Sequence, residues 1–147
     1  MSLKARLKEQ QILAMRAKDK VRLGTIRMLL AAIKQIEIDD KIELNDDGVM
    51  AVVIKSVKQR KDSITQFEKA KRIDLADIEK TELAILQEFL PQQLTSDEVK
   101  TLIEQAVTSS GANGMKDMGK VMGLLNKDTQ GRADMGEVSA LVRAALA

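Results

Sequence analysis

Residues 115–134 combine lysines and glycines in a pattern that suits contact with a phosphate backbone. On a helical wheel of about 100° per residue, one side holds Lys116, Gly119, Lys120, Gly123 and Lys127. The opposite side holds Met118, Val121, Met122 and Leu125. Because glycine has no side chain, a phosphodiester could approach the helix backbone between the ammonium groups. This pattern favours a contact surface over a reaction centre.

The same glycines also allow close packing of a second main chain. Glycine inside a helix costs about 1 kcal/mol relative to alanine, so a specific contact is expected at Gly119 and Gly123. Both glycines lie on the lysine side, away from the apolar stripe. A phosphate backbone and a neighbouring helix therefore both stay open as interpretations.

The next segment predicts a turn into another helix. Gly131 is expected to end the preceding helix with a positive φ. Arg132 stands just before the next helix, where its guanidinium could join a phosphate contact. Asp134 should cap that helix, with Glu137 completing a weak capping-box pattern. We therefore expect no separate anion site at the first amides of this helix.

Two further basic groups occur in the first half of the chain. Lys20, Arg27 and Lys34 recur every seven residues and should share one side of a helix. The densest group consists of Lys55, Lys58, Arg60 and Lys61. We expect Lys55, Lys58 and Lys61 to contact nucleic acid.

Arg60 is interpreted differently from its neighbours. It belongs to an apolar row formed with residues 53, 57, 64 and 67. An arginine in such a row is expected to pair with a carboxylate across a helix bundle, or to extend its head group to solvent.

The residue types offer little to a catalytic site. The chain has no cysteine and no histidine, which excludes thiolate nucleophiles, imidazole bases and zinc sites built on either. Asp39, Asp40, Glu43 and Asp46 could hold a divalent cation only weakly, because the EF-hand spacing is missing. Neither a phosphate-binding loop nor a dinucleotide fingerprint is present. We expect no active site, no cofactor and no metal.

The elements that position these residues are expected to be helices throughout. Apolar residues recur at helical spacing and predict helices at about 3–17, 20–38, 46–70 and 74–90. Asp19 and Asn45 are expected to cap the second and third helices. Pro91, the only proline, should end the fourth.

After Pro91 the pattern predicts a smaller domain. Thr95 and Glu98 fit a capping box, and three short apolar stripes then begin at Val99, Met118 and Val138. We therefore predict an all-α protein with two domains. Residues 1–92 form a helical N-terminal domain of about four helices, and residues 93–147 form a three-helix C-terminal domain.

Charge is distributed in zones along the chain. Residues 1–36 hold nine basic and two acidic side chains, whereas residues 37–54 hold one and six. Such zones are typical of charge pairing between antiparallel helices, and a basic strip for a polyanion is the alternative. The chain begins without the apolar region of a secretory signal, and its longest apolar run is too short to span a membrane. A cytoplasmic protein is expected.

Several segments together resemble the GatB/YqeY family, and specifically its YqeY-like proteins, along essentially the whole chain. The matching segments are residues 26–29, 32–34, 57–64, 67–70, 88–94, 118–122 and 131–134. The resemblance implies an all-helical protein with a smaller C-terminal domain. It also implies kinship with the tail of the B subunit of the glutamine-dependent aminoacyl-tRNA amidotransferase, a region associated with holding tRNA.

The function expected from these observations is a non-catalytic tRNA-binding accessory module. Without aromatic platforms it would grip the backbone and shape of RNA rather than stack on unpaired bases. A protein-interaction module that uses the glycine–lysine side is the alternative. Carbon–nitrogen ligase activity with glutamine as amido donor, which the family resemblance suggests, would require a larger assembly.

Overall fold

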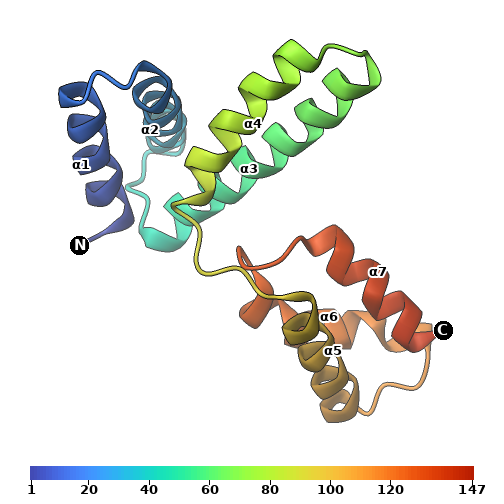
Figure 1. The fold of residues 1–147 in the computed structure, drawn as a ribbon. Helices are drawn as coiled ribbons and strands as arrows, with labels where there is room; N and C mark the ends of the chain where they lie inside the picture. Colours follow the sequence, from blue (N-terminus) through green and yellow to red (C-terminus); the bar gives the residue numbers. More distant parts are fainter. The chain divides into compact units, whose positions relative to one another are not determined.

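The computed structural model describes residues 1–147 and contains seven α-helices, one 3₁₀ turn and no strand (Figure 1). The predicted all-α fold class is confirmed, with four helices before Pro91 and three after it. The chain divides into two compact units, Met1–Leu90 (unit 1) and Pro91–Ala147 (unit 2). The sequence predicts this boundary between residues 92 and 93. No helix has the combined length and apolar character that a membrane crossing requires.

Unit 1 contains helices α1 (Leu3–Arg16), α2 (Lys20–Asp40), α3 (Asp46–Lys69) and α4 (Ile73–Gln87). The two predicted N-caps are confirmed. The Asp19 side chain accepts the N–H of Arg22, and the Asn45 side chain accepts the N–H of Gly48. Each cap satisfies a backbone donor that lacks a partner within the helix.

The end of α4 differs from the prediction. The helix stops at Gln87, and the N–H groups of residues 88–90 then donate to carbonyls three positions earlier. Pro91 disfavours the helical conformation of Leu90, so the chain tightens into a 3₁₀-type turn before it leaves the helix.

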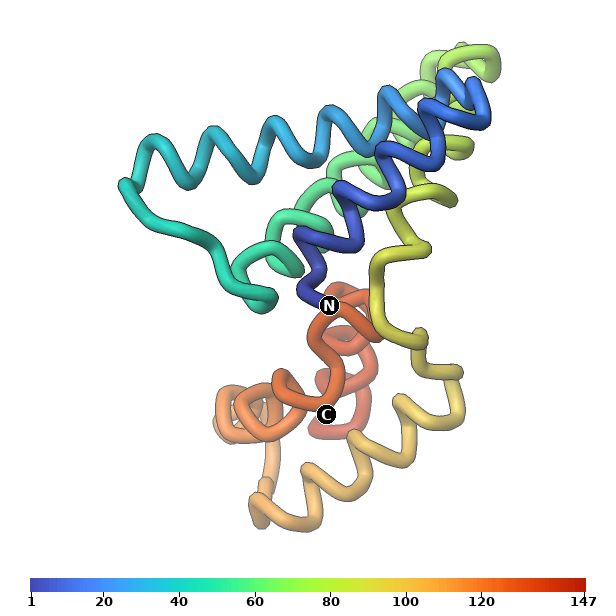
Figure 2. The backbone as a smooth tube through the Cα atoms, turned by 90° about the vertical axis from the view of Figure 1, so that its left-hand side faces the viewer, coloured from blue at the N-terminus to red at the C-terminus, as the bar shows by residue number.

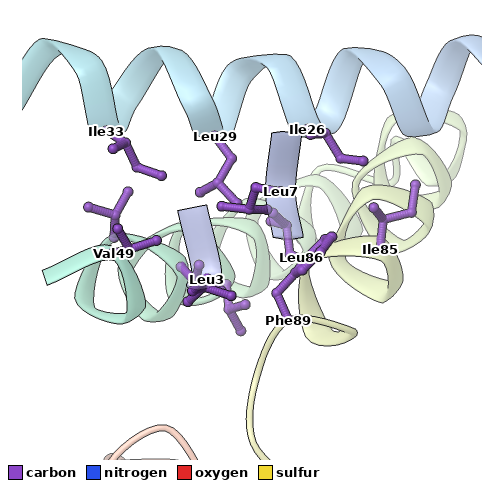
Figure 3. Packing of buried hydrophobic residues seen from close by; sticks show 12 residues of the cluster. Leu3, Leu7, Ile26, Leu29, Ile33, Val49, Ile85, Leu86 and Phe89 are labelled. Atoms are coloured by element: carbon purple, nitrogen blue, oxygen red, sulfur yellow. The ribbon is translucent and has the colours of Figure 1, made fainter. Parts of the chain in front are cut away.

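The core of unit 1 forms where all four helices meet (Figure 3). Ile26, Leu29 and Ile33 of α2 point toward Val49 of α3 and Leu7 of α1. Burial of side chains of this size stabilises the fold by about 1.5–3 kcal/mol each. All the buried residues of α3 precede Lys58. α3 and α4 pack against each other as a hairpin (Figures 1 and 2).

Three corners of unit 1 place a lysine in the left-handed region of backbone space. Lys18, Lys41 and Lys71 have φ values of 57°, 55° and 57°, and each follows the end of a helix. Glycine is the usual residue at such a position, because a Cβ is strained there.

Unit 2 contains α5 (Ser96–Ser110), the 3₁₀ turn η1 (Met115–Asp117), α6 (Met118–Thr129) and α7 (Met135–Leu146). The predicted capping box of Thr95 and Glu98 is confirmed, with both reciprocal bonds present. Residues on the inner sides of the three helices form a separate small core that includes Val99, Val121 and Val138. Unit 2 thus has its own hydrophobic centre.

The segment after Pro91 is fastened to the turn between α6 and α7. The N–H of Leu94 donates to the Arg132 carbonyl at 2.8 Å. The Gln93 side chain donates to the Gly131 carbonyl at 2.7 Å. These bonds make residues 92–94 part of unit 2 rather than a free linker.

Candidate nucleic-acid interface

The exposed side of α6 is lined by two glycines. Gly119 and Gly123 are both exposed, and a Cβ built on either would meet no atom within 4 Å. The opposite side of the helix is buried through Val121 and Leu125. The sequence pattern predicted this division, and no helix of the chain covers the glycines. The result is a strip of bare helix backbone open to solvent.

Three lysines border this strip. Lys120 and Lys127 lie on α6, Lys116 lies in η1, and all three side chains are exposed. None of the three forms an ion pair, so their charges are not neutralised within the chain. We call Lys116, Gly119, Lys120, Gly123 and Lys127 the Gly–Lys face.

The single helix assumed for residues 116–127 is wrong at its start. Lys116 belongs to η1, whose preceding residue Gly114 has a φ of 112°. The N–H of Asn113 donates to the Asp117 carboxylate at 2.9 Å and holds this turn. Lys116 therefore lies exposed in the turn that leads into α6, and a helical wheel does not give its position.

Two apolar side chains also lie near the Gly–Lys face. Leu124 on α6 is 49% exposed and Met115 in η1 is 48% exposed. Leu124 falls outside the buried stripe of α6. An exposed leucine beside lysines suits a protein contact as well as a nucleic acid.

Arg132 has a structural role that the sequence did not reveal. Its Nε donates to the Gln92 carbonyl at 3.0 Å, and its own carbonyl accepts the N–H of Leu94. The side chain is half-buried and braces the start of unit 2. The expected positive φ of Gly131 is confirmed at 76°. Asp134 caps α7, as predicted, by accepting the N–H groups of Gly136 and Glu137.

The basic cluster of α3 lies in unit 1. Lys55, Lys58 and Lys61 are all exposed, whereas Arg60 turns inward between α3 and α4. Arg60 pairs with Glu79 and Glu82, each at 3.1 Å, which confirms the expected pairing across the bundle. The cluster thus separates into three exposed lysines and one structural arginine.

The acidic residues near the start of α3 have partners within unit 1. The Asp46 carboxylate accepts the N–H of Leu3 at 3.0 Å, and Asp39 accepts the Gln35 side chain at 2.8 Å. Glu37 accepts both the Lys4 ammonium and the N–H of Leu44, and these bonds hold the pKa of its carboxyl below the ordinary value. No three acidic side chains are grouped closely enough to hold a metal ion. Asp39 and Asp46 of the acidic cluster thus have partners at the corner between α2 and α3.

Comparison with known proteins identifies the family. The sequence model of the Yqey-like protein family matches residues 4–146. The chain belongs to the YqeY-like family. The resemblance seen in the sequence is therefore confirmed.

Several curated proteins similar to this YqeY-like protein come from fungi. The Kluyveromyces lactis protein "Altered inheritance of mitochondria protein 41, mitochondrial" is 45% identical over 86 residues, 58% of this chain and 46% of that protein. Its counterpart of the same name in Lachancea thermotolerans is 32% identical over 145 residues, 94% of this chain and 78% of that protein. The Saccharomyces cerevisiae counterpart is 36% identical over 105 residues, which are 67% of this chain and 57% of that protein. The chain thus spans less than half of the Kluyveromyces protein and about three quarters of the Lachancea one.

Proposed function

We propose that this YqeY-like protein is a non-catalytic module that holds tRNA through its phosphate backbone, with the Gly–Lys face of α6 as the main contact. The observation that supports this is the exposure of two glycines between three lysines that have no ion-pair partner. An ammonium group can contact a phosphate oxygen, and the missing side chains let the sugar–phosphate chain lie against the helix.

The aromatic content limits how RNA could be bound. Phe67 and Phe89 are the only aromatic residues; Phe89 is buried and Phe67 is half-buried. No exposed aromatic platform is therefore offered to an unpaired base. Contacts to phosphate and to the shape of a folded RNA would dominate.

The choice of tRNA among folded RNAs rests on the resemblance to the amidotransferase B-subunit tail. In unit 1, Lys55, Lys58 and Lys61 supply a second exposed group of positive charge. We include these three lysines as a secondary contact. Arg132 would contribute only through the part of its guanidinium that does not brace Gln92.

Charge reversal tests the main contact. The variant Lys116→Glu, Lys120→Glu, Lys127→Glu lowers the formal net charge from +2 to −4. A control with Lys8→Glu, Lys100→Glu and Arg143→Glu makes the same change in net charge at three other exposed positions. We expect the first variant to lose tRNA in a filter-binding titration and the control to keep most of it. The slope of log K against log salt should fall by about 0.7–0.9 for each phosphate contact removed.

Equal retention of tRNA by both variants would exclude the Gly–Lys face as the site. Circular dichroism of each variant shows whether the fold is kept. A protein-interaction module is the second candidate, and the exposed Leu124 and Met115 favour it. Crosslinking in lysate with and without ribonuclease separates the two candidates, because only a protein partner would survive ribonuclease.

The names of the fungal relatives place those proteins in mitochondria. For this chain a cytoplasmic location stays a prediction. Fractionation of cells that express the tagged chain would test it.

A further inference from the structure

Helix α2 exposes a long row of apolar and small residues, interrupted by Gln35, on the side that faces away from the core of unit 1. Its core side points toward the other three helices of the unit (Figure 3). The row on the other side contains six exposed residues: Val21, Gly24, Met28, Ala31, Gln35 and Ile38. The three large apolar members are 50%, 58% and 60% exposed. Most surface helices have one apolar side, whereas α2 has two and only one of them is covered.

The spacing of this row is that of a coiled-coil seam. Successive members are separated alternately by three and four positions, as the a and d residues of a heptad repeat are. Over these residues the seam is about 25 Å long. Gly24 and Ala31 keep it shallow, and a Cβ at Gly24 would meet no atom within 4 Å. A second helix could therefore approach α2 closely at Gly24 and Ala31.

One edge of the seam is uniformly basic. Lys20, Arg27 and Lys34 stand at the flanking position of successive heptads, and all three are exposed without an ion-pair partner. Flanking charges of this kind set partner choice in helix pairs. At the other edge, Arg60 Nη2 lies 3.9 Å from the Met28 sulfur and is already paired with Glu79 and Glu82. The unneutralised charge is thus confined to one edge.

We infer that this side of α2 docks an amphipathic helix of another protein, which presents apolar residues to the seam and aspartate or glutamate to the basic edge. This surface belongs to unit 1 and is independent of the tRNA contact proposed for α6. An RNA is a poorer occupant, because phosphates gain nothing from the exposed valine, methionine and isoleucine.

A second copy of this chain also fits poorly. In an antiparallel pair, equivalent flanking positions face each other, so Lys20, Arg27 and Lys34 would meet the same residues of the other copy. In a parallel pair they would face Thr25, Ala32 and Asp39, of which only Asp39 is acidic and Thr25 is buried. Like charges therefore act against the antiparallel pair, and the parallel pair gains only one contact of opposite charge at this flank.

Two synthetic helical peptides test the inference. Both carry leucine at every a and d position; one has glutamate at all flanking positions and the other has lysine. Isothermal titration against the full chain should give binding of the glutamate peptide that is about tenfold tighter or more. The variant Lys20→Glu, Arg27→Glu, Lys34→Glu should reverse this preference. Ala31→Glu, at the centre of the seam, should weaken binding of the glutamate peptide about tenfold. Ala144→Glu, at an exposed site of α7, should leave this binding unchanged.

Equal binding of the two peptides, or no effect of Ala31→Glu with the fold intact by circular dichroism, would overturn the inference. Sedimentation that shows a dimer dissolved by Ala31→Glu would also overturn it, because the occupant would then be a second copy. The inference would also fail if neither peptide bound the wild type while the variant Lys20→Glu, Arg27→Glu, Lys34→Glu bound tRNA more weakly. In that case the basic edge would be an RNA contact. None of these results depends on Lys116, Lys120 or Lys127, so the two proposals can fail separately.

Discussion

Arg60 of α3 and Glu79 of α4 form an ion pair of 3.1 Å within the α3–α4 hairpin. Glu82, one helical turn further along α4, lies at the same distance from the same nitrogen. All three side chains are mostly buried, and Arg60 Nε is buried without a hydrogen-bond partner. One guanidinium therefore bridges two carboxylates of α4, although its single positive charge balances only one of them.

Replacement of this arginine should destabilise unit 1 far more than loss of an exposed ion pair. Arg60→Ala leaves two carboxylates close together and should cost about 2–3 kcal/mol of unfolding free energy in a urea titration. Lys80→Ala is the matched control, because it removes the exposed pair with Glu68 across the same two helices. It should cost less than about 1 kcal/mol. Equal losses in the two variants would contradict the structural role of Arg60.

The two glycines of α6 should lower the stability of the protein while they keep the helix backbone exposed. Gly123→Ala should raise the unfolding free energy by about 1 kcal/mol, because the added methyl meets no neighbour, and Gly119→Ala, in the first turn of α6, should raise it by less. Gly119→Gln and Gly123→Gln should keep most of that gain and fill the strip. On the proposed function, the glutamine variants bind tRNA more weakly in filter-binding assays.

Gly24→Gln provides the control for this experiment. Gly24 is an exposed helical glycine with the same open surroundings, but it lies on α2. Gly24→Gln should raise the unfolding free energy without weakening tRNA binding. If Gly24→Gln weakens tRNA binding as much as Gly123→Gln, the effect does not belong to the Gly–Lys face.

The lysines with positive φ mark sites where glycine should stabilise the protein. Lys41→Gly relieves the left-handed strain at the end of α2, where φ is 55°. After the greater backbone entropy of glycine is subtracted, we expect a gain of about 0.5–1 kcal/mol in thermal or urea unfolding. Lys58→Gly, in the exposed interior of α3, should instead lose about 1 kcal/mol. A loss at both positions would mean that the Lys41 side chain contributes more than the strain costs.

Stability should fall in acid partly through Glu37. The Lys4 ammonium and then the Leu44 amide lower the pKa of this carboxyl below 4.5 in the folded state. A carboxyl with a lowered folded pKa adds stability above its unfolded pKa, and this stability is lost as the pH falls through the folded pKa. The wild type should therefore lose more of its unfolding free energy between about pH 5 and pH 3 than Glu37→Gln does. Parallel pH profiles would show that Glu37 does not contribute.

The sequence by itself determined the helices and several of their starts. Apolar spacing located all seven, because a helix that buries one side must repeat its apolar residues every three or four positions. Asp19, Asn45 and Thr95 marked helix starts because short polar side chains satisfy the first free amides locally. The pairing of Arg60 was also predictable, since a charge in an apolar row needs a partner. The helix caps depend only on residues that are close along the chain, and the helices and the pairing of Arg60 depend only on the spacing of apolar residues.

Only the tertiary structure decided which side chains remain exposed and what they contact. The sequence could not show that Arg132 braces Gln92, because that bond joins residues 40 positions apart. It placed Lys116 on a helix that in fact begins two residues later, after a turn held by Asn113 and Asp117. The sequence did not single out the row from Val21 to Ile38, and only the packing of three helices on the other side of α2 left it uncovered. Burial depends on the placement of every element in a unit, and local sequence does not contain that information.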